Sequence, residues 1–212
     1  MIRRACLSLV LAAATLALAA AGRVERDLGG GLVYVRVHRL PADLPETPVG
    51  RVPPCVIDLR FVAADDAAAA AFAAWLKFRA SLRSPVFVLA NAETAEPLRK
   101  SLATRERGAG VMVVGAASEH LQPDVEVKTT ADDERRAYDA VEKGAALTAV
   151  LADNPHKVRH DEASLVRETQ VRPLPEVAEP GEGSAPADTP PIDATLQRAL
   201  HLHRALVAMK KL

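Results

Sequence analysis

The sequence is poor in aromatic residues and carries no net charge. Phe, Trp and Tyr make up 3% of its 212 residues, so a core must be built mainly from aliphatic side chains. The 27 basic and 27 acidic residues cancel, which leaves no overall attraction to nucleic acid or to anionic lipid. Nucleic-acid binding is therefore disfavoured.

Motifs that hold cofactors or metals are also missing. The sequence contains no phosphate-binding loop, no dinucleotide-binding fingerprint and no Cys-rich metal frame. His156 and His160 have the i, i+4 spacing of helical zinc ligands, but a flanking lysine and arginine oppose a cation, so we interpret them as part of a solvated face. Asp65 and Asp66 precede a helix-forming segment and are interpreted as caps, not as cation ligands. We predict no cofactor and no metal.

The first 21 residues have the pattern of a secretory signal peptide. A basic start is followed by an uncharged run rich in alanine and leucine that ends in small residues. We predict cleavage after Ala21 and export to the periplasm or the extracellular space, with an uncleaved membrane anchor as the alternative. Cleavage would remove Cys6 and leave Cys55 as a lone cysteine, which we interpret as a small core residue.

Short aliphatic runs alternate with helix-length segments and predict an α/β fold. Three of these runs, residues 55–61, 85–91 and 110–115, are largely apolar, as in parallel strands that are covered on both faces. Residues 23–28 are interpreted as a polar lead-in. Residues 32–40 alternate between apolar and polar, with Tyr34, Arg36 and His38 on the polar face, which predicts a half-buried strand near an edge. Residues 123–127 predict one further short strand.

Cap residues mark the predicted helices. Asp65, Thr94, Thr130 and Asp193 each stand before a helix-forming segment. The last of these helices carries an apolar stripe along residues 196–207, whose expected partner is the protein's own core.

The predicted domain organisation follows from composition. Residues 1–21 form the signal peptide and residues 22–170 form one α/β domain. Residues 171–191 contain six prolines among small and charged residues, which predicts a linker. Residues 192–212 form the C-terminal helix.

Six segments in a defined order resemble the C-terminal processing (tail-specific) serine peptidase family. They include a strand similar to Gly-x-Gly-Tyr-Ile-Arg-Ile, an Ile-Asp-Leu-Arg strand and a turn similar to the family's nucleophile turn. The segments are Gly31–Val37, Val56–Arg60, Val86–Glu96, Val113–Gly115, Leu121–Val127 and Asp193–Leu200. The resemblance implies a crotonase/ClpP-like core with a mostly parallel sheet and crossover helices.

The departures from the family pattern imply that catalysis has been lost. Glu96 stands at the position of the nucleophilic serine, and Ala64 and Asp65 replace the glycines expected at the oxyanion site. Residues 116–122 contain no lysine to act as the base. The resemblance therefore implies a catalytically inactive protein that binds a peptide or protein ligand or acts as a scaffold, with a groove beside Glu96 as the candidate surface.

Two other functions remain open from the sequence. The first is an active serine-type peptidase or hydrolase that uses Ser118 or Ser101 with a non-standard base. The second is a structural protein of the cell envelope whose last helix docks onto a partner. Neither alternative has a recognised motif in its support.

Overall fold

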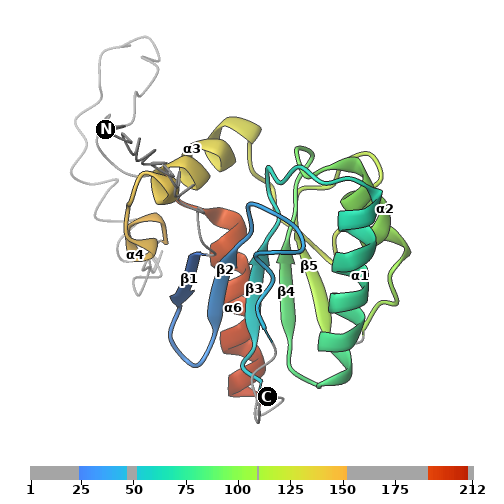
Figure 1. The fold of residues 1–212 in the computed structure, drawn as a ribbon. Coiled ribbons are helices and arrows are strands. Elements are labelled where there is room, and N and C mark those ends of the chain that lie inside the picture. Colours follow the sequence, from blue (N-terminus) through green and yellow to red (C-terminus); the bar gives the residue numbers. More distant parts are fainter. Residues whose placement is uncertain (1–23, 47–51, 109, 152–190, 210–212) are drawn as a thin grey trace, which may run out of the picture.

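The computed structural model describes residues 24–46, 52–108, 110–151 and 191–209. Within them the chain forms a six-stranded sheet whose strand order follows the sequence (Figure 1). The strands are β1 Val24–Asp27, β2 Val33–Arg36, β3 Cys55–Asp58, β4 Val86–Leu89, β5 Val111–Gly115 and β6 Val125–Glu126. β1 is antiparallel to β2, and each later strand is parallel to the one before it. The predicted α/β class and mostly parallel sheet are confirmed.

Helices cover both faces of the sheet (Figure 1). α1 Asp66–Ser81 and α2 Glu96–Thr104 follow β3 and β4 and pack on one face. α4 Leu147–Val150 and α6 Ala194–Ala208 pack on the other, together with α3 Ala131–Glu142. No helix among the described residues is long and apolar enough to cross a membrane.

The caps read from the sequence hold α1, α3 and α6 in place. Asp65 accepts a hydrogen bond from the Ala68 amide, Thr130 accepts one from Asp133, and Asp193 accepts one from Leu196. Each side chain satisfies an amide that has no partner within the first turn of its helix. Cap formation thus confirms these three predicted helix starts.

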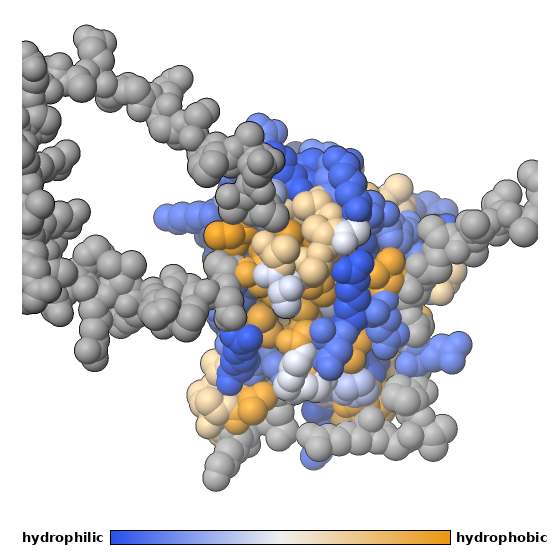
Figure 2. All heavy atoms as spheres, turned by 90° about the vertical axis from the view of Figure 1, so that its left-hand side faces the viewer, coloured by the Kyte–Doolittle hydropathy of each residue, from blue (hydrophilic) through white to orange (hydrophobic). Residues whose placement is uncertain are grey.

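α6 is part of the core. Its residues Leu196, Ala199 and Leu200 are at most 5% exposed and pack against strand residues such as Phe87. The expectation that this helix packs on the protein's own core is confirmed. Figure 2 shows hydrophobic side chains gathered on the β1 side of the molecule, with hydrophilic ones around them.

The structure corrects the prediction for the N-terminal part of the sheet. The segment before Gly29 was expected to be a polar lead-in, but it forms β1 and covers the edge of β2. Tyr34 and Arg36, expected on an exposed strand face, are 0% and 1% exposed. Tyr138 of α3 packs over Arg36, whose guanidinium lies 3.9 Å from the ring centroid, and Tyr34 belongs to the buried apolar cluster on the α3 and α6 face.

Cys55 is a core residue, as predicted. It is 2% exposed and forms no disulfide. Its sulfur accepts a hydrogen bond of 3.1 Å from the buried Arg79 guanidinium. Burial raises the pKa of the Cys55 thiol, and the charge of Arg79 only partly offsets this effect. The thiol is therefore held in its unreactive, protonated form.

Candidate functional site

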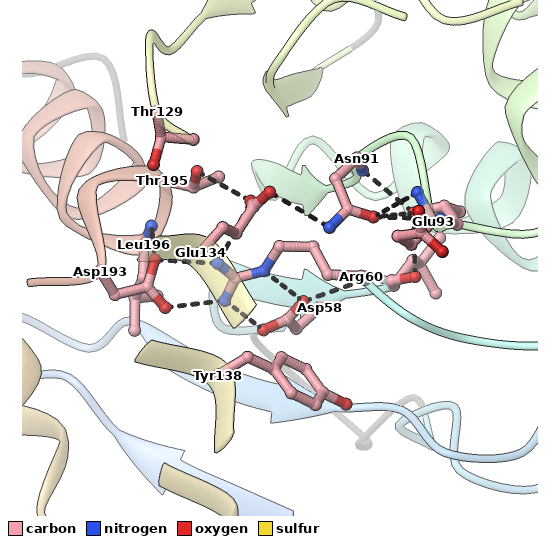
Figure 3. Close-up of polar contacts among 12 residues, drawn as sticks. Asp58, Arg60, Asn91, Glu93, Thr129, Glu134, Tyr138, Asp193, Thr195 and Leu196 are labelled. Carbon is pink, nitrogen blue, oxygen red and sulfur yellow. Dashed lines mark hydrogen bonds and ion pairs between the residues drawn. The ribbon is translucent and has the colours of Figure 1, made fainter. Parts of the chain in front are cut away.

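The carboxyl ends of β3 and β4 meet at one edge of the sheet, where α/β proteins usually bind ligands. Asp58 is the last residue of β3, and Arg60 follows it by two positions. Asn91 stands two residues beyond the end of β4. α3 and the start of α6 bring Glu134 and Asp193 to the same place (Figure 3). We call the side chains of Asp58, Arg60, Asn91, Glu134 and Asp193 the ionic cluster.

Arg60 is the centre of the ionic cluster. Its Nε and Nη2 donate to the two oxygens of Asp58 at 2.9 and 2.7 Å. Its Nη1 and Nη2 donate to the two oxygens of Asp193 at 2.9 and 2.8 Å. The guanidinium thus forms two bidentate pairs, the strongest geometry available to arginine. A longer contact of 3.5 Å joins Nη1 to Glu134.

Glu134 connects the four elements that meet at the cluster. One of its oxygens accepts from Arg60 and from the Thr195 hydroxyl at 3.2 Å, and the other accepts from the Asn91 amide at 3.1 Å. Glu134 is 5% exposed. The cluster therefore joins β3, β4, α3 and α6 through side chains that are far apart in the sequence.

A second layer of polar contacts extends the cluster towards β2. The Tyr34 hydroxyl donates to Asp58 at 2.8 Å and accepts from the Nε of Arg36 at 3.1 Å. Arg36 also donates to Glu142 at 2.7 Å. Glu142 is 52% exposed, so the chain of contacts reaches solvent at this end.

The cluster keeps its charged groups ionised although they are buried. Burial alone would raise the pKa of Asp58, but the opposing effects of Arg60, Arg36 and the Tyr34 hydroxyl prevail and the pKa is lowered. Burial would lower the pKa of Arg60, but Asp193 and Asp58 raise it well above its ordinary value. Burial, followed by the charge of Asp58, raises the pKa of Tyr138 to about 12.

The arrangement is suited to holding elements together and not to transferring protons. Among the described residues, every buried side-chain nitrogen and oxygen of the ionic cluster has a hydrogen-bond partner. A general acid or base needs a free position for the proton that it exchanges with a substrate. A closed set of ion pairs offers no such position.

Glu96, the residue at the expected nucleophile position, lies outside this cluster. It begins α2, its side chain is 51% exposed, and it pairs with Lys100 at 2.6 Å. The hydrogen bond and charge of Lys100 lower the pKa of Glu96. His120 lies 3.8 Å away and 3.4 Å from Glu119. Glu96 is thus one member of an exposed charged group.

The two positions expected to replace the oxyanion site belong to the start of α1. The Asp65 carboxylate is occupied by the amide of Ala68 at 2.8 Å, and Ala64 packs partly buried against the apolar core. Phe61, which directly follows Arg60, has a φ of 63° and stacks edge-on with Tyr138 at 4.8 Å. The Asp65 carboxylate thus accepts an amide at the start of α1, at the turn that would have to present free amides to an oxyanion.

Of the two serines considered as alternative nucleophiles, Ser118 is not brought together with a base among the described residues. The Ser118 hydroxyl is buried without a hydrogen-bond partner among the described residues, and its backbone pairs with Leu121. Ser101 lies on α2 and lines a groove between α1 and α2. Nucleophilic catalysis needs a base within hydrogen-bond reach of the hydroxyl, and Ser118 has none within the described part of the chain.

Sequence reasoning missed the role of Glu134 in the ionic cluster and the role of Thr94 beside it. Thr94 was expected to cap α2; instead its hydroxyl accepts from the backbone amide of Asn91 at 3.0 Å and donates to the Leu59 carbonyl at 3.1 Å. Glu134 looks like an ordinary first-turn acid of α3. A usable signal was Asp58 and Arg60, because two opposite charges at the end of an apolar strand predict a buried pair.

Comparison with known proteins adds no assignment. The chain matches no protein-family model, and a search of curated proteins gave no match. His156, His160 and the predicted signal peptide lie outside the described residues, as does all of the proposed linker except Pro191.

Proposed function

We propose that the protein is an exported, catalytically inactive module with a tail-specific-peptidase-like, crotonase/ClpP-like core, which binds a peptide or protein ligand or acts as a scaffold. The ionic cluster carries the proposal. At the carboxyl ends of β3 and β4, where α/β proteins usually bind ligands, Arg60 instead forms two bidentate pairs with Asp58 and Asp193. Such a cluster stabilises one arrangement of the elements and leaves no reactive group facing a substrate.

The state of the expected nucleophile position supports the same proposal. Glu96 has no hydroxyl and is paired with Lys100 on the surface. A carboxylate in a surface ion pair forms no ester intermediate of the kind that a serine peptidase turns over. The remaining route is binding through a surface of the folded core.

A fluorophosphonate probe tests the absence of serine chemistry in the full chain. We expect no labelling under conditions that label an active serine peptidase. Glu96→Ser is the matched variant; it should remain unlabelled as well, because Lys100, the lysine beside this position, is exposed to solvent and residues 116–122 supply no other lysine. Labelling of the wild-type protein at Ser101 or Ser118 would establish the hydrolase alternative and overturn the proposal.

The binding half of the proposal is tested separately. The immobilised protein is exposed to a mixture of short synthetic peptides, and a column carrying an unrelated protein of similar charge serves as the control. We expect retention of a subset of peptides. Equal elution from both columns would leave the scaffold as the only form of the proposal.

A further inference from the structure

A groove between α1 and α2 has the properties of a ligand site. Its volume is about 360 Å³, within the range of roughly 300–1,000 Å³ typical of small-molecule pockets. Its lining includes Leu76 and Val111, which are 5% and 4% exposed. Ala73 and Ala80 widen it because their side chains are small. No member of the ionic cluster lines it.

The rim of the groove carries one free charge of each sign. Lys77 and Glu106 both line it and are both exposed. Neither makes an ion pair within the part of the chain that the structure describes. Ser101 and Thr104 add hydroxyl groups to the same rim. The groove therefore presents an apolar interior between an ammonium and a carboxylate.

Arg105 lines the groove and is held in place by several contacts. Its side chain is 8% exposed, Nη1 donates to the Leu102 carbonyl at 2.6 Å, and Nη2 pairs with Asp124. Asp124 is in turn held by the amide of Val113 at 2.8 Å. The Nε of Arg105 is buried and has no partner among the described residues. A wall held at several points gives a preformed groove, which reduces the entropy lost on binding.

We propose that this groove binds a peptide segment of a partner protein through an aliphatic side chain flanked by one acidic and one basic residue. The acidic residue faces Lys77 and the basic residue faces Glu106. A peptide fits better than a fatty acid, because a fatty acid has a single charge and needs a longer apolar channel. The inference rests on the proposed binding function and locates it away from Glu96.

Four short peptides test this proposal in a titration followed by heteronuclear NMR. The probes are acetyl-Asp-Leu-Leu-Arg-amide, acetyl-Arg-Leu-Leu-Asp-amide, acetyl-Asp-Leu-Leu-Asp-amide and acetyl-Arg-Leu-Leu-Arg-amide. We expect one of the two mixed-sign peptides to bind best, with shift changes at Leu76, Ser101 and Val111. Decanoate, titrated in parallel, should leave these signals unchanged.

Charge reversal makes the specificity predictable. Lys77→Glu leaves two negative charges on the rim, so Arg-Leu-Leu-Arg should become the preferred peptide. Glu106→Lys should make Asp-Leu-Leu-Asp the preferred one. These exposed substitutions leave the fold intact, so the readout does not depend on stability.

Filling the groove gives a second test. Ala73→Trp should weaken binding of the best peptide roughly tenfold, whereas Ala74→Trp, at an exposed neighbour outside the lining, should not. Thermal melting checks that both variants are folded.

Several results would overturn this inference: no binding of any probe, shift changes confined to Glu96 and His120, or a shift of the groove signals by decanoate. Shift changes around Glu96 would overturn the location alone and leave the proposed binding function intact. Labelling of the protein by fluorophosphonate would overturn the proposed function alone.

Discussion

The face of the sheet beneath α1 and α2 and the face beneath α3 and α6 are closed in different ways. The first is apolar up to the strand ends, with Phe72, Leu98 and Leu102 packed on Val35, Ile57 and Val88. The second has a similar apolar centre but ends in the ionic cluster. Successive strand residues point to opposite faces. Ile57 of β3 therefore packs on the apolar α1 and α2 face, whereas the next residue, Asp58, belongs to the ionic cluster on the other face.

The difference shows how precisely each face positions the helices that cover it. Burial of aliphatic side chains is non-directional and tolerates small changes of angle. A bidentate pair between Arg60 and Asp193 fixes both distance and orientation. The start of α6, which is 133 residues from Arg60 in the sequence, is positioned by this directional contact.

Arg60→Ala should produce the largest effect. It leaves the carboxylates of Asp58 and Asp193 buried without a cation, which costs about 3–5 kcal/mol of unfolding free energy. Urea unfolding of the variant measures the loss. Arg204→Ala, an exposed position on α6, is the control and should change little. A loss below about 1 kcal/mol for Arg60→Ala would contradict the role given to the cluster.

Leu98→Ala makes the corresponding change on the apolar face. Leu98 is 0% exposed, and truncation of such a residue costs about 2–5 kcal/mol through lost burial and a residual cavity. The decrease in unfolding free energy caused by Leu98→Ala should be the same at neutral and at acidic pH, because no titrating group is involved. A pH-dependent loss in this variant would show that the two faces are coupled.

Asp193→Asn separates the ion pair with Arg60 from the cap of α6. Asparagine caps as well as aspartate does, so the change removes mainly the charged contacts to Arg60. The loss should be about 2 kcal/mol, as for a buried hydrogen bond to a charged group. Asp65→Asn provides the matched control at an exposed cap. Equal losses of unfolding free energy at the two positions would show that the charged contacts to Arg60 add nothing beyond the cap.

Acidification should weaken the α3 and α6 face first. The pKa of Asp58 is lower in the folded than in the unfolded chain. At acidic pH the folded chain therefore binds fewer protons than the unfolded chain. The contribution is complete above about pH 4, the ordinary value for aspartate, and is lost as the pH falls through the folded pKa. Asp58→Asn should show a shallower loss of stability below pH 4 in urea unfolding. Equal slopes in both proteins would contradict this prediction.

Asp65→Ala should have the smallest measurable effect. It removes the hydrogen bond to the amide of Ala68, which costs about 1 kcal/mol for a typical cap. Asp65→Asn should restore nearly full stability. If Asp65→Ala were neutral, the α1 cap would contribute nothing beyond what solvent supplies.

Local patterns determined strands β2 to β6, the crossover helices and three of the caps. Val86–Leu89 is buried on both faces, and such a strand can be recognised in the sequence as a continuous apolar run. The capping box at Thr130 and Asp133 depends only on residues three positions apart. Signals of this kind can be read from the sequence because the interacting groups are neighbours in the chain.

Tertiary structure alone decided the β1 strand, the burial of Tyr34 and Arg36, and the ionic cluster. Val24–Asp27 alternates between partly buried and exposed residues and becomes a strand only because β2 offers an unpaired edge. Arg60 and Glu134 have polar side chains that favour solvent until partners from β3, α3 and α6 compensate their desolvation. That compensation depends on residues up to 133 positions apart, a separation at which sequence periodicity carries no information.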